Sequence, residues 1–196
     1  MAGRETKAER KAKILAEAKN LFARHGLKKT SMDDIAKAVD LVKTSLYYYF
    51  NGKQELFQAV IRHESETLIK KLQIEIDKYH SPQRKLRAYF ITRMEYLKEL
   101  ANIFQLTRGV AWELLPLVEE ERRRFTDAEK RLVADILEKG TQSGVFGIDN
   151  FEFVAVVIIA SMRGLESTLL LYQDRELSAA DYNAMLEVLL YGILKG

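Results

Sequence analysis

The sequence contains no cysteine. Disulfide frameworks, thiolate zinc sites, cysteine-ligated iron–sulfur clusters and cysteine nucleophiles are therefore excluded from this chain. Proline and glycine are also scarce, with 2 and 10 positions among 196 residues. A sandwich or barrel of many short strands needs more turn-forming residues than this. The shortage of both residues excludes an all-β fold.

A long apolar run is also missing. The longest uncharged apolar stretch extends from Phe153 to Met162 and ends at Arg163, well short of the roughly 18 residues that a membrane helix needs. Residues 1–13 are rich in lysine and arginine and have no apolar centre of the kind found in a signal peptide. We therefore expect a cytoplasmic protein without a membrane partner, and a buried helix at the apolar stretch.

Positive charge is concentrated near the start of the chain. Residues 1–53 contain 12 lysines and arginines against 6 aspartates and glutamates, whereas residues 54–196 contain 19 against 22. The formal charge is thus +6 in the first part and −3 in the second, although the net charge is only +3. This asymmetry indicates either a surface that binds a polyanion or a solvated basic tail.

Three short helices are predicted near the N-terminus. Apolar residues recur at three- and four-residue spacing over residues 7–25, and Gly26 follows as a C-terminal cap. Ser31 is a good N-cap for the second helix, with Asp34 three residues later in a short version of the capping box. The third helix spans residues 43–50 and ends at an Asn-Gly pair.

Longer helices are predicted for the rest of the chain. Ser81 and Pro82 are typical of an N-cap and a first helical position, and Pro116 is expected to interrupt a long helical region. The sequence contains no internal repeat or long linker, so Gly52 is the only credible boundary. We predict an all-α protein of about nine helices. The six longer ones are expected at residues 53–79, 82–100, 102–115, 116–143, 150–172 and 178–195.

The tight connection between the second and third helices is typical of a helix-turn-helix. The most specific segments are LFARHG at residues 21–26, SMDDIAKA at residues 31–38 and LYYYFNGKQELF at residues 46–57. Over about residues 10–60 the chain resembles the DNA-binding half of the TetR family, and the remainder agrees with that family in length and helical character. The resemblance implies a helix-turn-helix DNA-binding domain, residues 1–52, followed by a helical ligand-binding and dimerisation domain, residues 53–196.

Two positions depart from the family pattern. Asp40 stands at the turn position usually held by glycine, and it tolerates a left-handed backbone better than most residues. Val42 stands at the following cap position, usually a serine, and has no side-chain oxygen to accept a backbone N–H bond. The expected cost is about 1 kcal/mol of local helix stability, with Asp40 as a candidate to cap the helix from upstream.

We expect the third helix to enter the major groove of DNA. It begins with a cation and two small hydroxyls at the positive end of the helix dipole, which suits contact with phosphates and base edges. The hydroxyls of Tyr47 and Tyr49 can donate hydrogen bonds to phosphates, and the alternative is that the tyrosine rings are ordinary core aromatics. Tyr48 is a candidate to pack on the first helix. By resemblance, Lys53 meets a phosphate at the start of the next helix. The predicted DNA-binding residues are Ser31, Lys43, Thr44, Ser45, Tyr47, Tyr49 and Lys53.

A single helix-turn-helix reads few base pairs, so specificity normally requires two copies on a palindromic site. The segment Phe151–Tyr172 is apolar almost all round, and residues 181–194 repeat the pattern, which a surface helix does not show. As in the TetR family, a four-helix interface across a twofold axis would cover both. The predicted partners are a double-stranded DNA operator and a second copy of the chain, bound through the last two helices.

An apolar stripe runs along the helix that follows Pro82. Its aromatic and methionine side chains suit either a pocket for a small hydrophobic effector or plain core. Arg93 lies beside this stripe, where it either faces a ligand carboxylate or phosphate or is exposed to solvent. The predicted ligand-binding residues are Phe90, Arg93, Met94, Leu97, Phe104, Trp112 and Met162.

The sequence offers no support for catalysis. The three histidines, His25, His63 and His80, lack the carboxylate or second-histidine spacing of a zinc site, and no serine lies in a nucleophile-elbow context. We predict no enzyme activity, no metal and no cofactor. The favoured function is a ligand-responsive transcriptional repressor. The alternatives are a DNA-binding protein of the same fold without a small ligand and a helical protein-interaction module.

Overall fold

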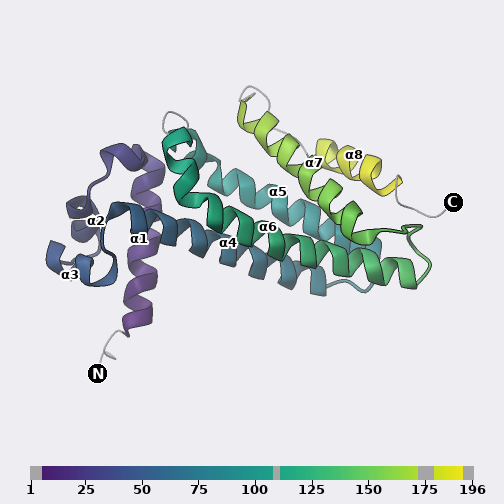
Figure 1. Ribbon diagram of the computed structural model, residues 1–196, viewed down its shortest axis with the longest axis horizontal. Coiled ribbons are helices and arrows are strands. Elements are labelled where there is room, and N and C mark those ends of the chain that lie inside the picture. The colour runs from purple at the N-terminus through teal and green to yellow at the C-terminus, as the bar shows by residue number, and fades with distance from the viewer. Residues whose placement is uncertain (1–5, 108–110, 172–178, 192–196) are drawn as a thin grey trace. The chain divides into compact units, whose positions relative to one another are not determined.

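The computed structural model describes residues 6–107, 111–171 and 179–191, with side chains for residues 6–96, 119–165 and most of 181–188. Within them the chain forms eight α-helices and no strand, which confirms the predicted all-α class (Figure 1). The helices are α1 (Lys7–Lys29), α2 (Met32–Ala38), α3 (Lys43–Tyr49), α4 (Lys53–Asp77), α5 (Pro82–Thr107), α6 (Ala111–Gln142), α7 (Phe151–Leu171) and α8 (Ala179–Tyr191).

Contacts divide the chain into two compact units, which are described separately. Unit 1 comprises Met1–Glu66 and Leu100–Arg122, and unit 2 comprises Thr67–Glu99 and Arg123–Gly196. Helices α4, α5 and α6 each contribute a segment to both units. Among the described helices, none has both the length and the apolar character needed to span a membrane.

Helix α1 begins and ends with specific local features. A capping box that sequence reasoning did not identify opens it, in which the Glu9 N–H donates to the Thr6 hydroxyl at 3.2 Å and the Thr6 N–H donates to the Glu9 carboxylate at 2.7 Å. Gly26 has φ 78° and interrupts the helix, as its predicted role as a cap requires. A short helical continuation then reaches Lys29.

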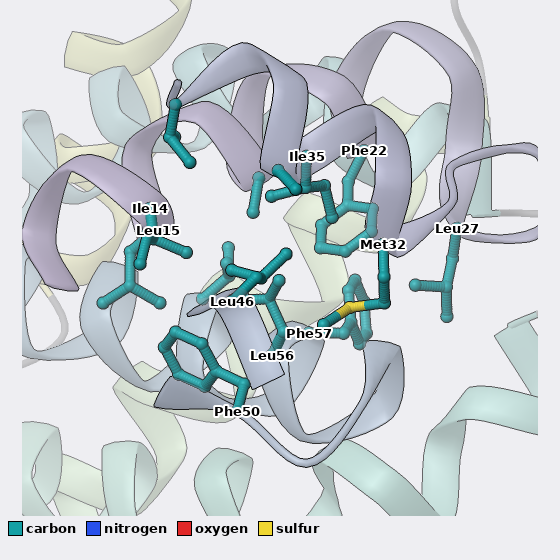
Figure 2. Close-up of a cluster of buried hydrophobic side chains, with 14 residues drawn as sticks. Ile14, Leu15, Phe22, Leu27, Met32, Ile35, Leu46, Phe50, Leu56 and Phe57 are labelled. Atoms are coloured by element: carbon teal, nitrogen blue, oxygen red, sulfur yellow. The ribbon is translucent and has the colours of Figure 1, made fainter. Parts of the chain in front are cut away.

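Fourteen buried side chains form the core of the helix-turn-helix region, drawn from the first four helices and the segments between them, and Figure 2 shows them gathered between the ribbons. The Phe22 ring of α1 meets the Phe57 ring of α4 edge-on, with centroids 5.5 Å apart. Leu46 of α3 and Phe50 just beyond it are both buried. This core holds α3 against α1 and α4.

Two buried carboxylates in unit 1 are paired with basic side chains. Lys19 of α1 lies 2.7 Å from Glu64 of α4, and Nε of Arg62 on α4 donates to Glu121 on α6 at 2.9 Å. Pairing of this kind offsets the cost of removing a carboxylate from water. The two ion pairs join α4 to α1 and to the first part of α6.

The second part of the chain differs from the sequence prediction at one proline. Pro116 does not interrupt a helix, because α6 runs through it from Ala111 to Gln142, and the preceding helix α5 ends at Thr107. The prediction of a break at Pro116 is therefore wrong. Proline removes one backbone donor, and near the N-terminal end of a helix of 32 residues this loss leaves most of the hydrogen-bond ladder intact.

Side-chain caps and one-sided burial shape the other helices of unit 2. Ser81 accepts a hydrogen bond from the Arg84 N–H at 3.5 Å, and Pro82 is the first residue of α5, as predicted. Asn150 accepts from the Phe153 N–H at 2.9 Å and opens α7. In the single chain α7 buries Ala155, Ile158, Ile159 and Met162 and exposes Phe153, Val156 and Val157.

The turn that follows α6 depends on a close approach between Gly140 and Phe146. The backbone N–H groups of Val145 and Phe146 both donate to the Gly140 carbonyl, at 2.9 and 3.1 Å, and the Phe146 side chain is buried. A Cβ atom added at Gly140 would lie 2.1 Å from Cδ2 of Phe146. Only glycine leaves room for the ring.

We expect Gly140→Ala to lower the free energy of unfolding by about 1–3 kcal/mol, because the added methyl displaces a packed ring. Urea denaturation monitored by circular dichroism measures this change. The matched experiment is a double-mutant cycle with Phe146→Leu, whose smaller side chain gives way to the new methyl. The two effects should then be less than additive. Additive losses would show that the contact with Phe146 is not the reason for glycine at this position.

Candidate nucleic-acid interface

The interface is built around the pair of short helices α2 and α3. Ser31 caps α2 as predicted: its hydroxyl accepts from the Asp34 N–H at 3.2 Å, and its own N–H donates to the Asp34 carboxylate at 2.9 Å. Hydrogen bonds from the Ser31 hydroxyl and backbone lower the pKa of Asp34. Ser31 is exposed and remains accessible to a ligand, but its main visible role is to begin α2.

The turn between α2 and α3 has the conformation that the sequence suggested. Asp40 has φ 57°, in the left-handed region, and the Leu41 N–H donates to the Ala36 carbonyl at 2.9 Å. Val42 is the N-cap of α3 and makes no side-chain cap bond. The Asp40 carboxylate lies 3.8 Å from the Lys13 ammonium of α1. It therefore does not take the predicted role of capping α3 from upstream.

Helix α3 buries its apolar side and exposes small polar residues. Lys43 and Thr44 are exposed, Ser45 is half-buried, and Leu46 is the buried residue that fastens the helix to the core. An exposed helix start with a cation and small hydroxyls allows close approach of another surface. Lys43 and Thr44 are therefore accessible to DNA, whereas Ser45 is accessible only in part.

The tyrosines of α3 differ in their surroundings. Tyr47 is exposed, whereas Tyr49 is partly buried against the core, which limits the part of its ring that can reach DNA. Tyr48 is 71% exposed, and its hydroxyl lies 3.4 Å from the Lys7 ammonium. It therefore does contact the first helix, but without being buried. Sequence reasoning had not included Tyr48 among the DNA-binding residues.

Lysines of α1 approach the C-terminal end of α3. The Lys7 ammonium lies 4.7 Å from the centroid of the Tyr48 ring, and the Lys11 ammonium lies 5.4 Å from that of Phe50. These cation–π contacts connect the first two turns of α1 to the end of α3. With Lys43 at the other end, cationic side chains occur at both ends of α3, a feature that the sequence order alone did not reveal.

Lys43 is held by an acidic neighbour. Its ammonium lies 2.9 Å from the Asp33 carboxylate of α2, and the hydrogen bond and charge of Asp33 raise the pKa of Lys43. Both side chains are about half exposed, so the pair contributes little to stability. A phosphate that binds Lys43 competes with Asp33 for the same ammonium.

Lys53 lies where α4 begins. Its ammonium donates to the Lys28 carbonyl at 3.3 Å, near the C-terminal end of α1. The Glu55 carboxylate accepts from the Asn51 N–H at 2.9 Å, just before α4. The Lys53 ammonium is therefore close to the backbone at Lys28.

The predicted ligand-binding residues are placed in unit 2 as far as they are described. Phe90, Met94 and Met162 are buried. Arg93 is also buried and lies 2.6 Å from Glu129, so the expectation that it is exposed to solvent was wrong. A carboxylate on the neighbouring helix makes that burial possible. Leu97, Phe104 and Trp112 lie outside the residues whose side chains are described.

Metal-ligating side chains do not gather in the described part of the chain into a group of three that could hold an ion. The acidic side chains of the interface are instead used for capping or for pairing with lysine, as in Asp34 and Asp33. The arrangement as a whole presents a short exposed helix, small hydroxyls and several cations. Such a surface suits the phosphates and base edges of duplex DNA.

Residues 14–60 match the family model described as bacterial regulatory proteins, tetR family. The HTH-type transcriptional repressor KstR2 of Mycolicibacterium smegmatis is 29% identical over 143 residues, which are 72% of this chain and 70% of that protein. Residues 14–60 therefore form a DNA-binding region of the TetR type. A solved structure of a transcriptional regulator from Cytophaga hutchinsonii is 26% identical with a TM-score of 0.77, and the match covers 93% of this chain and 97% of that one.

A further solved structure has the same fold at lower identity. The ketosteroid transcriptional regulator KstR2 of Mycobacterium tuberculosis has a TM-score of 0.64 and 22% identity, over 98% of each chain. The match to the family model and the similarity to the Mycolicibacterium smegmatis repressor give the general function of this chain. It is a DNA-binding transcriptional regulator.

The Asp33–Lys43 pair predicts an unusual response to loss of a carboxylate. We expect Asp33→Asn to raise DNA affinity about two- to fivefold, because Lys43 no longer has to leave a salt bridge to reach a phosphate. Fluorescence anisotropy with a labelled duplex measures the effect. Asp40→Asn is the matched control, since it removes the same charge and asparagine also tolerates a positive φ. Equal gains in both variants would indicate a general charge effect and contradict a specific role for the pair.

Proposed function

We propose that this protein is a repressor that binds a palindromic operator as a homodimer and is released by a small hydrophobic effector. In this proposal residues 1–52 bind DNA, and residues 53–196 bind the effector and a second copy of the chain. The observation that carries it is the exposed polar start of α3, held in place by the buried Leu46 and Phe50. A helix presented in this way is suited to the major groove.

Each candidate contact has a distinct role in this proposal. Lys43, Tyr47 and Lys53 bind phosphates and orient the domain, whereas Thr44 and Ser45 approach base edges and read the sequence. Ser31 and Tyr49 complete the set of predicted DNA-binding residues, with Ser31 at the start of α2 and Tyr49 at the end of α3. Exposure of Lys43 and Thr44 supports the assignment.

Two classes of substitution separate these roles. Lys53→Ala should weaken binding to all duplexes about equally and reduce the salt slope by about 0.9 per subunit, because one phosphate contact is lost. Thr44→Ala and Ser45→Ala should instead change which operator is preferred in a selection from random duplexes. Anisotropy titrations at several salt concentrations provide the measurement. Unchanged affinity and preference in all three variants would contradict the assigned interface.

Dimerisation is supported by an apolar face that the single chain leaves uncovered. Phe153 is 64% exposed on α7, where Val156 and Val157 are also exposed, and Val188 is 76% exposed on α8. Exposed large apolar side chains on neighbouring turns mark interaction surfaces more often than isolated ones do. We propose that this face is covered by the same face of a second copy, which a twofold axis relates to the first.

The dimer proposal predicts that a charge on this face separates the subunits. Val157→Glu should sediment as a monomer at micromolar concentration, because its carboxylate would be buried without a partner at the interface. The position is exposed in the single chain, so folding should be retained. Ile74→Glu is the matched control, since Ile74 is 62% exposed on α4. Sedimentation of the unsubstituted protein as a monomer would contradict the proposal.

An effector site in the later domain is supported by the apolar side chains buried there. Phe90 and Met94 lie one turn apart on α5, and Met162 comes from α7. The structural neighbour from Mycobacterium tuberculosis is a ketosteroid transcriptional regulator, which is consistent with an apolar effector here. In the proposed dimer, DNA binding requires a particular spacing between the two copies of α3. If the effector stabilises a different spacing, a typical coupling free energy between the two sites would weaken DNA binding about 5- to 150-fold.

A further inference from the structure

The interior of unit 2 contains a polar cluster formed by α5 and α6. The Glu129 carboxylate of α6 accepts two hydrogen bonds at Oε1, from the Tyr89 hydroxyl at 2.8 Å and from Nε of Arg93 at 2.6 Å. All three side chains are buried, with Tyr89 at 0%, Glu129 at 1% and Arg93 at 4% exposure. The Arg93 guanidinium also lies 5.3 Å from the centroid of the Phe125 ring.

The two oxygens of Glu129 are used unequally. Both donors meet Oε1, and Oε2 is buried without a hydrogen-bond partner among the described residues. A buried charged oxygen left without a donor is destabilising, and native proteins usually satisfy such an atom with protein, water or ligand. A donor from outside the chain would remove this imbalance.

We propose that Oε2 of Glu129 accepts a hydrogen bond from the hydroxyl group of an otherwise apolar, uncharged effector. This inference rests on the proposed function, and it specifies the chemistry of the molecule that the later domain binds. Tyr89 and Arg93 are positioning residues, because they hold the other oxygen and leave Oε2 for the ligand. Phe90 and Met94, which follow Tyr89 and Arg93 along α5, are also buried.

The charge of the cluster decides between classes of ligand. Arg93 and Glu129 carry opposite unit charges, so the buried pair is neutral as a whole. A ligand carboxylate would introduce an anion beside Glu129, and a ligand ammonium would leave an excess positive charge in the interior, both of which are unfavourable. A neutral hydroxyl donates to Oε2 without changing the charge. The cluster therefore disfavours the ligand carboxylate or phosphate that the sequence suggested for Arg93.

Two matched sets of probes test this chemistry by isothermal titration calorimetry. One set is 1-octanol, methyl octyl ether and octanoate, and the other is 2-naphthol, 2-methoxynaphthalene and 2-naphthoate. Within a set the three probes have matching hydrocarbon groups, but only the alcohol or the naphthol is a neutral hydrogen-bond donor. In at least one set the donor should bind at least about tenfold more tightly than the methyl ether, because a hydrogen bond to a charged acceptor is worth about that much. It should also bind more tightly than the carboxylate of the same set.

Substitutions assign this preference to Glu129. Glu129→Gln places an amide N–H where Oε2 lay, so the dissociation constant of the methyl ether divided by that of the donor should fall to about one. Because this variant removes the carboxylate that pairs with Arg93, the double variant Arg93→Met with Glu129→Gln provides the same test with both members of the ion pair replaced. Glu121→Gln is the matched control, since Glu121 is a buried carboxylate paired with Arg62 in unit 1. It should retain the preference of the unsubstituted protein.

Three outcomes would overturn the inference: equal binding of donor and ether, tighter binding of the carboxylates, or binding of none of the six probes. A preference that persists in both Glu129 variants would overturn it as well. Operator binding by the protein without probe is measured separately by anisotropy. Absence of the donor preference in the unsubstituted protein, with operator binding intact, would refute the role of Glu129, whereas absence of operator binding would refute the proposed function.

Discussion

Helices of seven residues are not stable alone in water, and α2 and α3 both have that length. Their existence depends on the buried cluster that joins them to α1 and α4, in which Phe22, Leu46 and Phe57 are nearly or fully inaccessible to solvent. Because the core supplies the stability, the outward residues of α3 are free to be small and polar. Even the missing side-chain cap at Val42 is then tolerable, since tertiary contacts hold the helix.

Burial also determines what each charged side chain does. Glu64, Glu121 and Glu129 are buried and paired with Lys19, Arg62 and Arg93, as buried carboxylates require. The Lys43–Asp33 pair lies at the surface, where its energy is small and a phosphate can replace the carboxylate. The same kind of ion pair is therefore structural in the interior and exchangeable at the interface. Glu129 combines burial with an unused oxygen, which is why it stands apart from the other two.

Much of the helix-turn-helix was predictable because its signals are local. The capping box of Ser31 and Asp34, the positive φ of Asp40 and the interruption at Gly26 each depend on a few consecutive residues. Pro116 shows the limit of such signals, since its effect depends on where the helix begins, and the sequence placed that start at the wrong position. The capping box at Thr6 was overlooked although the pattern of threonine and glutamate is visible in the sequence.

The sequence by itself determined the helical class, the position of the short helix α3 and the resemblance to the TetR family, because periodicity, caps and family motifs are properties of short segments. Only the tertiary structure decided that Arg93 is buried against Glu129, that Lys7 reaches Tyr48 and that Asp33 holds Lys43. These contacts join residues that are 10 to 41 positions apart. Whether a charged side chain meets water or a partner depends on how separate helices pack, and a pattern read along one helix carries no information about the helix that faces it.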